Sequence, residues 1–451
     1  MLVKICSLCM KIVREKCVST MKGNRNVGLL IVFLLITIAM AVAFFPGVNH
    51  NVAEGMASIT AIDGSSLDDA SHTIFDTLTY AKSIHILAML LLGFGFLMVF
   101  LRGHEFTSLT ATFLAVSISI PVYLLVKSFL PGEFEVMNIS GFLFAEFAAA
   151  SLLICMGAVL GRLKMDQYFV LGILFTVAYI FNEWLLLESG LFKGFLDTGG
   201  SVAIHAFGAY FGLGVVMMTD KKFAGRPGPK ADKISNEFCL LGSMVLWLFW
   251  PSFTSSVVAP EQSYATVLNT VLALAGSTLA TYVFTKLIRG KIEVEDIANA
   301  ALAGGVSIGS TCSSANPGFA MVIGICAGTL STVGFAIIAP KVCKLIRGTD
   351  TCGVHNLHGM PGLLGGLFGI AITGNVGVQV GACLATVVSG LVLGRVCGAI
   401  LGLMGTKETT YDDADDFLLE EAEEEPEPEP VAPVVSAPVF PTSRDYFVPD
   451  K

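Results

Sequence analysis

Two copies of one short motif hold the residues of this chain that are best able to do chemistry. Each copy reads Asp-Thr-x-Gly-x4-His, the first from Asp197 to His205 and the second, 153 residues later, from Asp350 to His358. An Asp-Thr pair at a helix start can cap free backbone N–H groups and complement the helix dipole. Each imidazole can donate or accept a hydrogen bond and can carry a proton. Two roles are compatible with the aspartates: they cap the helices only, or they cap the helices and also take part in the function of the protein.

The elements around both motifs are long apolar blocks. The 451 residues are 54% hydrophobic and 14% charged, whereas globular domains carry about 25% charged residues. Apolar blocks of about 18 residues or more predict membrane-spanning helices, so we expect an all-α polytopic membrane protein of about twelve transmembrane helices. The ninth is short and rich in glycine, which indicates a bent or partly buried segment. The expected spans are 28–45, 83–101, 108–130, 141–160, 167–187, 201–219, 237–257, 266–286, 298–311, 318–340, 355–373 and 378–402.

Basic residues alternate from one connection to the next. They gather in residues 1–27 and in every second loop that follows, while the loops between carry few. Because Lys and Arg stay on the cytoplasmic side, this alternation predicts an even number of spans with both termini in the cytoplasm. We expect the plasma membrane as the location, with membrane lipid around the helices. Block 28–45 is interpreted as a retained helix, and a cleaved signal peptide is the alternative.

The two motifs begin the sixth and the eleventh expected spans. An odd number of spans separates them, so the copies enter the membrane from opposite faces, which is typical of an inverted repeat, here of five plus five helices. Eight residues of helix rise ~12 Å, which brings each histidine near the centre of a ~30 Å apolar core. His205 and His358 are therefore expected to meet in mid-membrane, where an ionisable residue is costly and usually functional.

Such a histidine pair favours one kind of small molecule in the pore. Burial penalises charge, so the two imidazoles are expected to be neutral, to share one N–H···N bond and to offer further donors and acceptors. A small hydrogen-bonding molecule such as ammonia suits that lining, whereas an unpaired cation in an apolar lumen costs many kcal/mol. We expect ammonium to lose its proton on entry, with the histidine pair or Asp197 relaying that proton.

At these residues the chain resembles the Rh glycoproteins, a branch of the ammonium transporter superfamily. The resemblance covers roughly residues 80–402. It implies an ammonia channel that assembles as a homotrimer with one pore in each subunit. The strings that carry it are 197–213 (DTGGSVAIHAFGAYFGL), 246–253 (LWLFWPSF), 299–309 (NAALAGGVSIG), 350–366 (DTCGVHNLHGMPGLLGG), 94–101 (FGFLMVFL) and 157–162 (GAVLGR).

The resemblance assigns the pore and its gate. His205 and His358 match the twin pore histidines of the family, and Phe147 and Phe253 match two stacked phenylalanines that gate the outer mouth. Plain core packing is the alternative for both phenylalanines, since the chain has 32 of them. Val257 stands where bacterial-type relatives carry a serine that helps to bind the cation, which favours facilitated, near-electroneutral flux.

The resemblance also assigns acidic residues along the entry path. Asp197 matches the residue beneath the outer vestibule, and Asp350 is its counterpart in the second half. Glu146 and Glu183 match acidic vestibule positions that attract ammonium. For these two glutamates, a helix-end charge that faces water or a neighbouring helix is the alternative.

A third histidine lies close to the second motif histidine. His355 precedes His358 by three residues, which on an α-helix gives nearly the same face. His355 and its neighbour Asn356 are therefore candidates for the inner part of the pore, and a structural hydrogen bond is the alternative for His355.

Composition divides the chain into five segments. Residues 1–27 form a basic cytoplasmic arm, 28–45 the first transmembrane helix, 46–82 a polar extracellular loop and 83–404 the channel core. Residues 405–451 are acidic and rich in proline, and they lack the apolar residues that could offset the entropy of ordering. We expect a disordered cytoplasmic tail that is either a solubilising spacer or a binding segment for a cytoplasmic partner.

Three rival functions fit parts of the pattern. A non-conducting Rh-like scaffold subunit would not need both motif histidines, which this chain keeps. A membrane metalloenzyme built on the histidines lacks a metal-binding signature such as H-E-x-x-H, so we expect no metal, no cofactor and no enzymatic activity. Carbon dioxide as the conducted gas stays open, because a narrow apolar lumen could pass either molecule. No basic patch with interleaved aromatic residues indicates nucleic acid.

Overall fold

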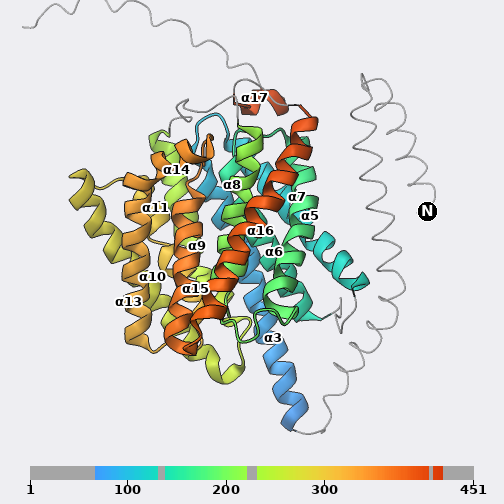
Figure 1. Ribbon diagram of the computed structural model, residues 1–451, viewed down its shortest axis with the longest axis vertical. Coiled ribbons are helices and arrows are strands. Elements are labelled where there is room, and N and C mark those ends of the chain that lie inside the picture. The colour runs from blue at the N-terminus through green and yellow to red at the C-terminus, as the bar shows by residue number, and fades with distance from the viewer. Residues whose placement is uncertain (1–66, 131–137, 221–230, 406–409, 420–451) are drawn as a thin grey trace, which may run out of the picture. The chain divides into compact units, whose positions relative to one another are not determined.

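The computed structural model describes residues 67–130, 138–220, 231–405 and 410–419. Every regular element in these ranges is a helix (Figure 1). The expected first span, 28–45, and the arm before it lie outside the described residues. The first helices are α3 (Leu67–Ala88), the π-helical turn η1 (Met89–Phe94), α4 (Gly95–Leu97), the 3₁₀ turn η2 (Met98–Phe100), α5 (Glu105–Phe129), α6 (Ile139–Val159) and α7 (Met165–Glu183).

The chain then passes through both motifs. The middle elements are the π-helical turns η3 (Trp184–Glu188) and η4 (Ser201–Ala206), then α8 (Phe207–Thr219), α9 (Lys233–Ser255), α10 (Pro260–Arg289), α11 (Val294–Ala300), α12 (Ala303–Ile308) and the 3₁₀ turn η5 (Gly309–Thr311). The last are α13 (Pro317–Val333), the π-helical turn η6 (Gly334–Ile338), α14 (Ala339–Ile346), the π-helical turn η7 (His355–Gly359), α15 (Met360–Thr373), α16 (Val376–Leu403) and α17 (Asp413–Asp416).

Nine helices within the described residues are long and apolar enough to cross a membrane. This finding confirms an all-helical, polytopic membrane fold. The stretches Ile139–Val159 and Ser201–Thr219 are the most enclosed, with 89% of their apolar windows buried, whereas Val376–Leu403 has 33% buried. Helices α6 and η4–α8 therefore form the centre of the bundle, and α16 lies at its surface with its other face on α8.

An expected boundary differs from the structure, and an expected irregular span agrees with it. Helix α3 begins at Leu67, so the second half of the loop expected over 46–82 is helical. Hydropathy locates the apolar stretch of a helix and misses a polar turn that extends beyond the membrane. The expected short span 298–311 is a broken stretch of α11, α12 and η5, which agrees with its glycine content.

The start of the acidic tail contacts the helical core. The Tyr411 N–H donates to the Gly161 carbonyl and the Asp413 N–H to the Gly103 carbonyl, over 3.1 and 2.8 Å. The Asp413 carboxylate accepts from the N–H groups of Phe106 and Thr107, which caps the start of α5. One compact unit therefore ends at Asp416, twelve residues beyond the core boundary expected at 404, because aspartates that look like tail residues satisfy helix N-termini.

Removal of the Asp413 carboxylate tests this docking. Asp413→Ala leaves two N–H groups of α5 without their acceptor, and a lost N-cap costs about 1 kcal/mol. We expect a lower apparent Tm in detergent for Asp413→Ala. Asp412→Ala is the control, because it removes a neighbouring exposed carboxylate, whereas the N–H groups at the start of α5 donate to Asp413. Equal melting of the two variants would contradict the assigned cap.

Candidate functional site

In both motifs the fourth residue is a glycine with left-handed backbone conformation, and a π-helical turn follows it. Gly200 has φ 74° and Gly353 has φ 66°, a region that side chains disfavour. In the first motif, the N–H of His205 donates to the Gly200 carbonyl over 3.1 Å, across five residues. The four residues of the x4 spacer are thus wound more widely than in an α-helix, and each histidine lies at a fixed place on such a turn.

An aspartate caps each of the two turns. Asp197 accepts hydrogen bonds from the N–H groups of Val202 and Ala203, at distances of 2.8 to 3.1 Å. Asp350 accepts from those of Val354 and His355, both at 2.9 Å. The capping role that the sequence suggested for the aspartates is therefore present in the structure. It also fixes where each π-helical turn begins.

Each motif is held by a segment from the other half of the chain. The N–H groups of Thr198 and Gly199 donate to the carbonyls of Ser310 and Gly309. Correspondingly, the N–H groups of Thr351 and Cys352 donate to the carbonyls of Ala158 and Gly157. The two sets of contacts match residue by residue. The motif in the first half is held by a segment of the second half, and the motif in the second half by a segment of the first, as an inverted repeat requires.

The two motif histidines meet. Nδ1 of His205 lies 3.2 Å from Nδ1 of His358, and the ring planes differ by 8°. Only 3% and 4% of these side chains are exposed. One ring must donate through Nδ1–H and the other accept, so the pair shares one hydrogen bond and leaves both Nε2 atoms for other contacts. Nε2 of His205 is buried and has no hydrogen-bond partner.

A small cavity adjoins His205, and we call it the His205 cavity. Its volume is about 10 Å³. The His205 ring is nearly parallel to the Trp250 ring, with centroids 5.5 Å apart. Phe253 lies at one side, and its ring centroid is 4.5 Å from that of Phe147. The lining residues are Met89, Leu90, Phe94, Ala150, His205, Trp250 and Phe253.

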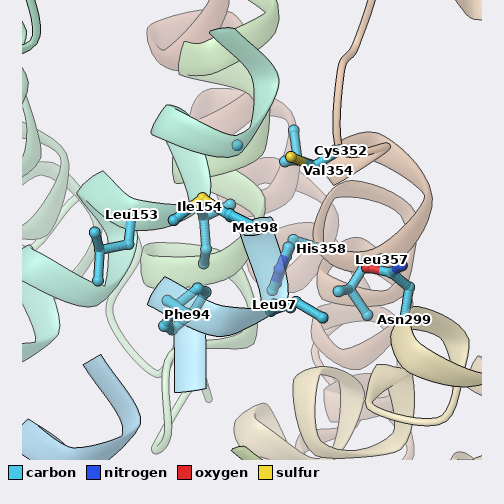
Figure 2. A pocket seen from close by; sticks show the side chains of 11 residues that line it. Phe94, Leu97, Met98, Leu153, Ile154, Asn299, Cys352, Val354, Leu357 and His358 are labelled. Carbon is cyan, nitrogen blue, oxygen red and sulfur yellow. The ribbon is translucent and has the colours of Figure 1, made fainter. Parts of the chain in front are cut away.

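A second cavity, the His358 cavity, lies on the other side of the pair. Its volume is about 20 Å³. Figure 2 shows the His358 ring amid its lining side chains, with Phe94 on one side and Leu357 and Asn299 on the other. Phe94 lines both cavities. The lining residues are Phe94, Leu97, Met98, Leu153, Ile154, Gly157, Asn299, Cys352, Val354, Leu357 and His358.

Comparison with known proteins identifies the family. A sequence model of the Ammonium Transporter Family matches residues 56–418. This chain belongs to that family. Ammonium transporter Rh type B of Homo sapiens is 35% identical over 361 residues, which cover 78% of this chain and 77% of the relative. The Danio rerio Rh type B protein is 36% identical over 314 residues, or 68% of this chain and 67% of the relative.

Solved structures agree with this assignment. Nitrosomonas europaea Rh50, of the Rhesus protein family of channels, shares 46% identity at a TM-score of 0.75, over 78% of this chain and 94% of that one. A sensor Amt protein has a TM-score of 0.67 at 18% identity, which shows the fold alone. The chain is therefore a member of the Rh branch of the ammonium transporter family, as its motifs indicated.

The two glutamates that the sequence predicts at the vestibule have different surroundings. Glu146 is fully buried, and its Oε1 accepts from the Ser83 hydroxyl over 2.9 Å, whereas Oε2 has no partner. Glu183 accepts from the Tyr123 hydroxyl over 2.7 Å and pairs with Lys127. The contacts of Glu183 join α7 to α5, which favours its alternative role in helix packing. Neither glutamate lines either cavity.

His355 and Asn356 are absent from the linings of both cavities. The His355 ring faces Tyr210, with centroids 5.7 Å apart, and its Nδ1 has no partner. Asn356 lies beside Gly334 at the end of α13. On an α-helix His355 would share a face with His358, but these residues form a π-helical turn, which is wider and rotates His355 away.

Most of the lining residues were not singled out from the sequence, and three of them have polar or aromatic side chains that bear on the site. Trp250, Phe94 and Asn299 all lie within the strings that carry the family resemblance. Trp250 matters most, since its indole Nε1 is buried without a partner. An aromatic residue in an apolar span gives no signal of its own, so only that string could have pointed to it. Across the described residues, no group of three or more His, Cys, Asp or Glu side chains could hold a metal ion.

Proposed function

We propose that this Rh protein conducts uncharged ammonia through the His205 cavity, past the histidine pair and through the His358 cavity. The observation that carries this proposal is the Nδ1–Nδ1 contact of 3.2 Å between two buried imidazoles with a cavity on either side. Transport of this kind needs no covalent chemistry, so we assign no catalytic residue and no cofactor.

The size and lining of the two cavities suit ammonia. A cavity of about 10–15 Å³ holds one water molecule, and the two volumes here are about 10 and 20 Å³. Ammonia is similar to water in size and in its ability to hydrogen bond. Both cavities have largely apolar walls, and His205, which lines the first of them, has a buried Nε2 with no hydrogen-bond partner.

The same lining disfavours ammonium. No carboxylate is among the lining residues of either cavity, so a cation there would be buried without a counter-ion. We propose that ammonium gives up its proton on entry at the Phe147–Phe253 gate, with the histidine pair or Asp197 relaying that proton. Since the proton returns to the side of entry, net transfer is that of the neutral molecule.

The proposed assembly and location rest on the family resemblance. We propose a homotrimer with one pore in each subunit, in the plasma membrane, with both termini in the cytoplasm. The alternation of basic loops supports the orientation. We propose the acidic segment that follows Asp416 as the binding segment for a cytoplasmic partner.

Stopped-flow measurement on proteoliposomes tests the proposal. After an inward ammonia gradient, we expect internal pH to rise faster than in protein-free liposomes of the same lipid. The rate should increase with external pH, as the uncharged fraction grows. The same vesicles given a carbon dioxide gradient provide the comparison. If the protein accelerates the pH change for carbon dioxide but not for ammonia, carbon dioxide is the substrate and the proposal is wrong. If it accelerates neither pH change, a non-conducting scaffold subunit is favoured.

A further inference from the structure

The two halves of the inverted repeat differ in the side chain that faces the capping aspartate. Ser310 and Ala158 occupy matching places, because their carbonyls accept from Thr198 and Thr351 respectively. The Ser310 hydroxyl donates to Oδ1 of Asp197 over 2.6 Å. Ala158 has no hydroxyl, and for Asp350 the described residues provide backbone donors only.

The backbone of Ser310 makes a further contact with the first motif. Its N–H donates to the Ser201 hydroxyl over 2.7 Å, and that hydroxyl donates to the Val306 carbonyl over 2.6 Å. Ser310 and Ser201 are fully buried. In the second motif, Val354 stands at the place of Ser201 and cannot form such a link. The first motif is therefore tied to η5 and α12 through the Ser201 and Ser310 side chains. The second motif has a side-chain tie from the Thr351 hydroxyl to the Leu160 carbonyl, over 3.1 Å, but none to its capping aspartate.

Ala158 lies at a close crossing of two helices. A Cβ atom on Gly212 would lie 2.8 Å from Cβ of Ala158 and 3.0 Å from the Cys155 carbonyl. Helices α6 and α8 thus cross too closely at this point for a side chain on residue 212. Ala158, the counterpart of Ser310, therefore lies against a glycine.

We infer that Ser310 is a positioning residue for conduction: its hydroxyl fixes the Asp197 carboxylate and, through the cap, the turn that carries His205. A hydrogen bond to a carboxylate is stronger than one between neutral groups, and a buried one is hard to replace with water. The His205 side chain is the fixed member of the histidine pair, and the His358 side chain is the member that moves as ammonia passes. This inference rests on the proposed ammonia conduction for its transport consequence, but its structural part stands alone.

The structural part is tested by hydrogen exchange in detergent. We expect slower amide exchange in residues 202–205 than in 355–358 of the unaltered protein. Ser310→Ala should speed exchange in 202–205 and leave 355–358 unchanged. Thr311→Val is the matched control, because Thr311 is adjacent and buried and its hydroxyl has no partner. Equal exchange in both turns, or no effect of Ser310→Ala, would overturn the inference.

The transport part is tested on the same variants in proteoliposomes. We expect Ser310→Ala to lower ammonia flux several-fold, Ser310→Thr to restore it, and Thr311→Val to match the unaltered protein. If Ser310→Ala does not fold, Ser310→Cys keeps the side-chain volume with a weak donor and should also lower flux. Normal flux through Ser310→Ala overturns the positioning role. Absence of flux in the unaltered protein counts against the proposed function instead, and the exchange result then still decides the role of Ser310.

Discussion

Replacing either pore histidine by leucine, as His205→Leu or His358→Leu, is expected to lower ammonia flux about tenfold or more. Leucine nearly fills the space of imidazole and removes its polar atoms, so the guest crosses mid-membrane without a hydrogen-bonding partner. A missing hydrogen bond for a buried polar group costs about 1–3 kcal/mol, and ~1.4 kcal/mol is a factor of ten in rate. Stopped-flow traces of internal pH in proteoliposomes provide the measurement.

A histidine that lines neither cavity provides the control for these variants. His85 on α3 is exposed at the bundle surface, where its Nδ1 contacts the Ser252 hydroxyl and its ring stacks on Phe249. His85→Leu removes an imidazole from a span without touching either cavity, so its flux should equal that of the unaltered protein. Undiminished flux in both pore variants would show that the histidine pair is not on the path of ammonia.

Gly200→Ala is expected to abolish most of the flux and to lower the melting temperature. Gly200 has φ 74°, which costs an alanine about 1 kcal/mol or more. An added Cβ would also lie 2.3 Å from Cδ1 of Ile204, directly before His205. The turn must therefore shift, and the Nδ1–Nδ1 contact of the pair is lost with it. Flux and apparent Tm of the purified variant measure the two effects.

Gly194→Ala separates the strain of the backbone from the displacement of His205. Gly194 has φ 87°, and an added Cβ there would meet nothing within 4 Å. This variant should show a similar backbone cost with normal flux. If Gly194→Ala lowers flux as much as Gly200→Ala does, general loss of stability explains both results, and the special role of the Gly200 turn is wrong.

The spacing of the repeated motif was enough to predict that two histidines meet in the membrane. Eight residues from each capping aspartate reach the midplane on any helix-like path, so the prediction did not depend on the exact winding. The placement of His355 did depend on it. Nothing in the composition of His355–Gly359 distinguishes a π-helical turn from an α-helix, because the winding is imposed by the Asp350 cap and the neighbouring helices.

Contacts between the two halves of the chain likewise could not be predicted from the sequence. The link from Ser310 to Asp197 joins residues 113 apart, and a lone serine in a glycine-rich span carries no signal of its partner. The same holds for Glu183, whose partner Lys127 stands on another helix. The tail shows the reverse case, since its acidic composition predicted disorder while Asp413 was needed at the start of α5.

Electrical recording during ammonia uptake tests the central claim most directly. Proteoliposomes adsorbed on a solid-supported membrane receive a pulse of ammonium, and current is recorded beside the internal pH of the same preparation. If the neutral molecule passes the histidine pair, internal pH rises quickly and no sustained current accompanies it. A sustained inward current that grows in proportion to the flux, and that His205→Leu removes, would show that charge crosses with the substrate and would contradict the account.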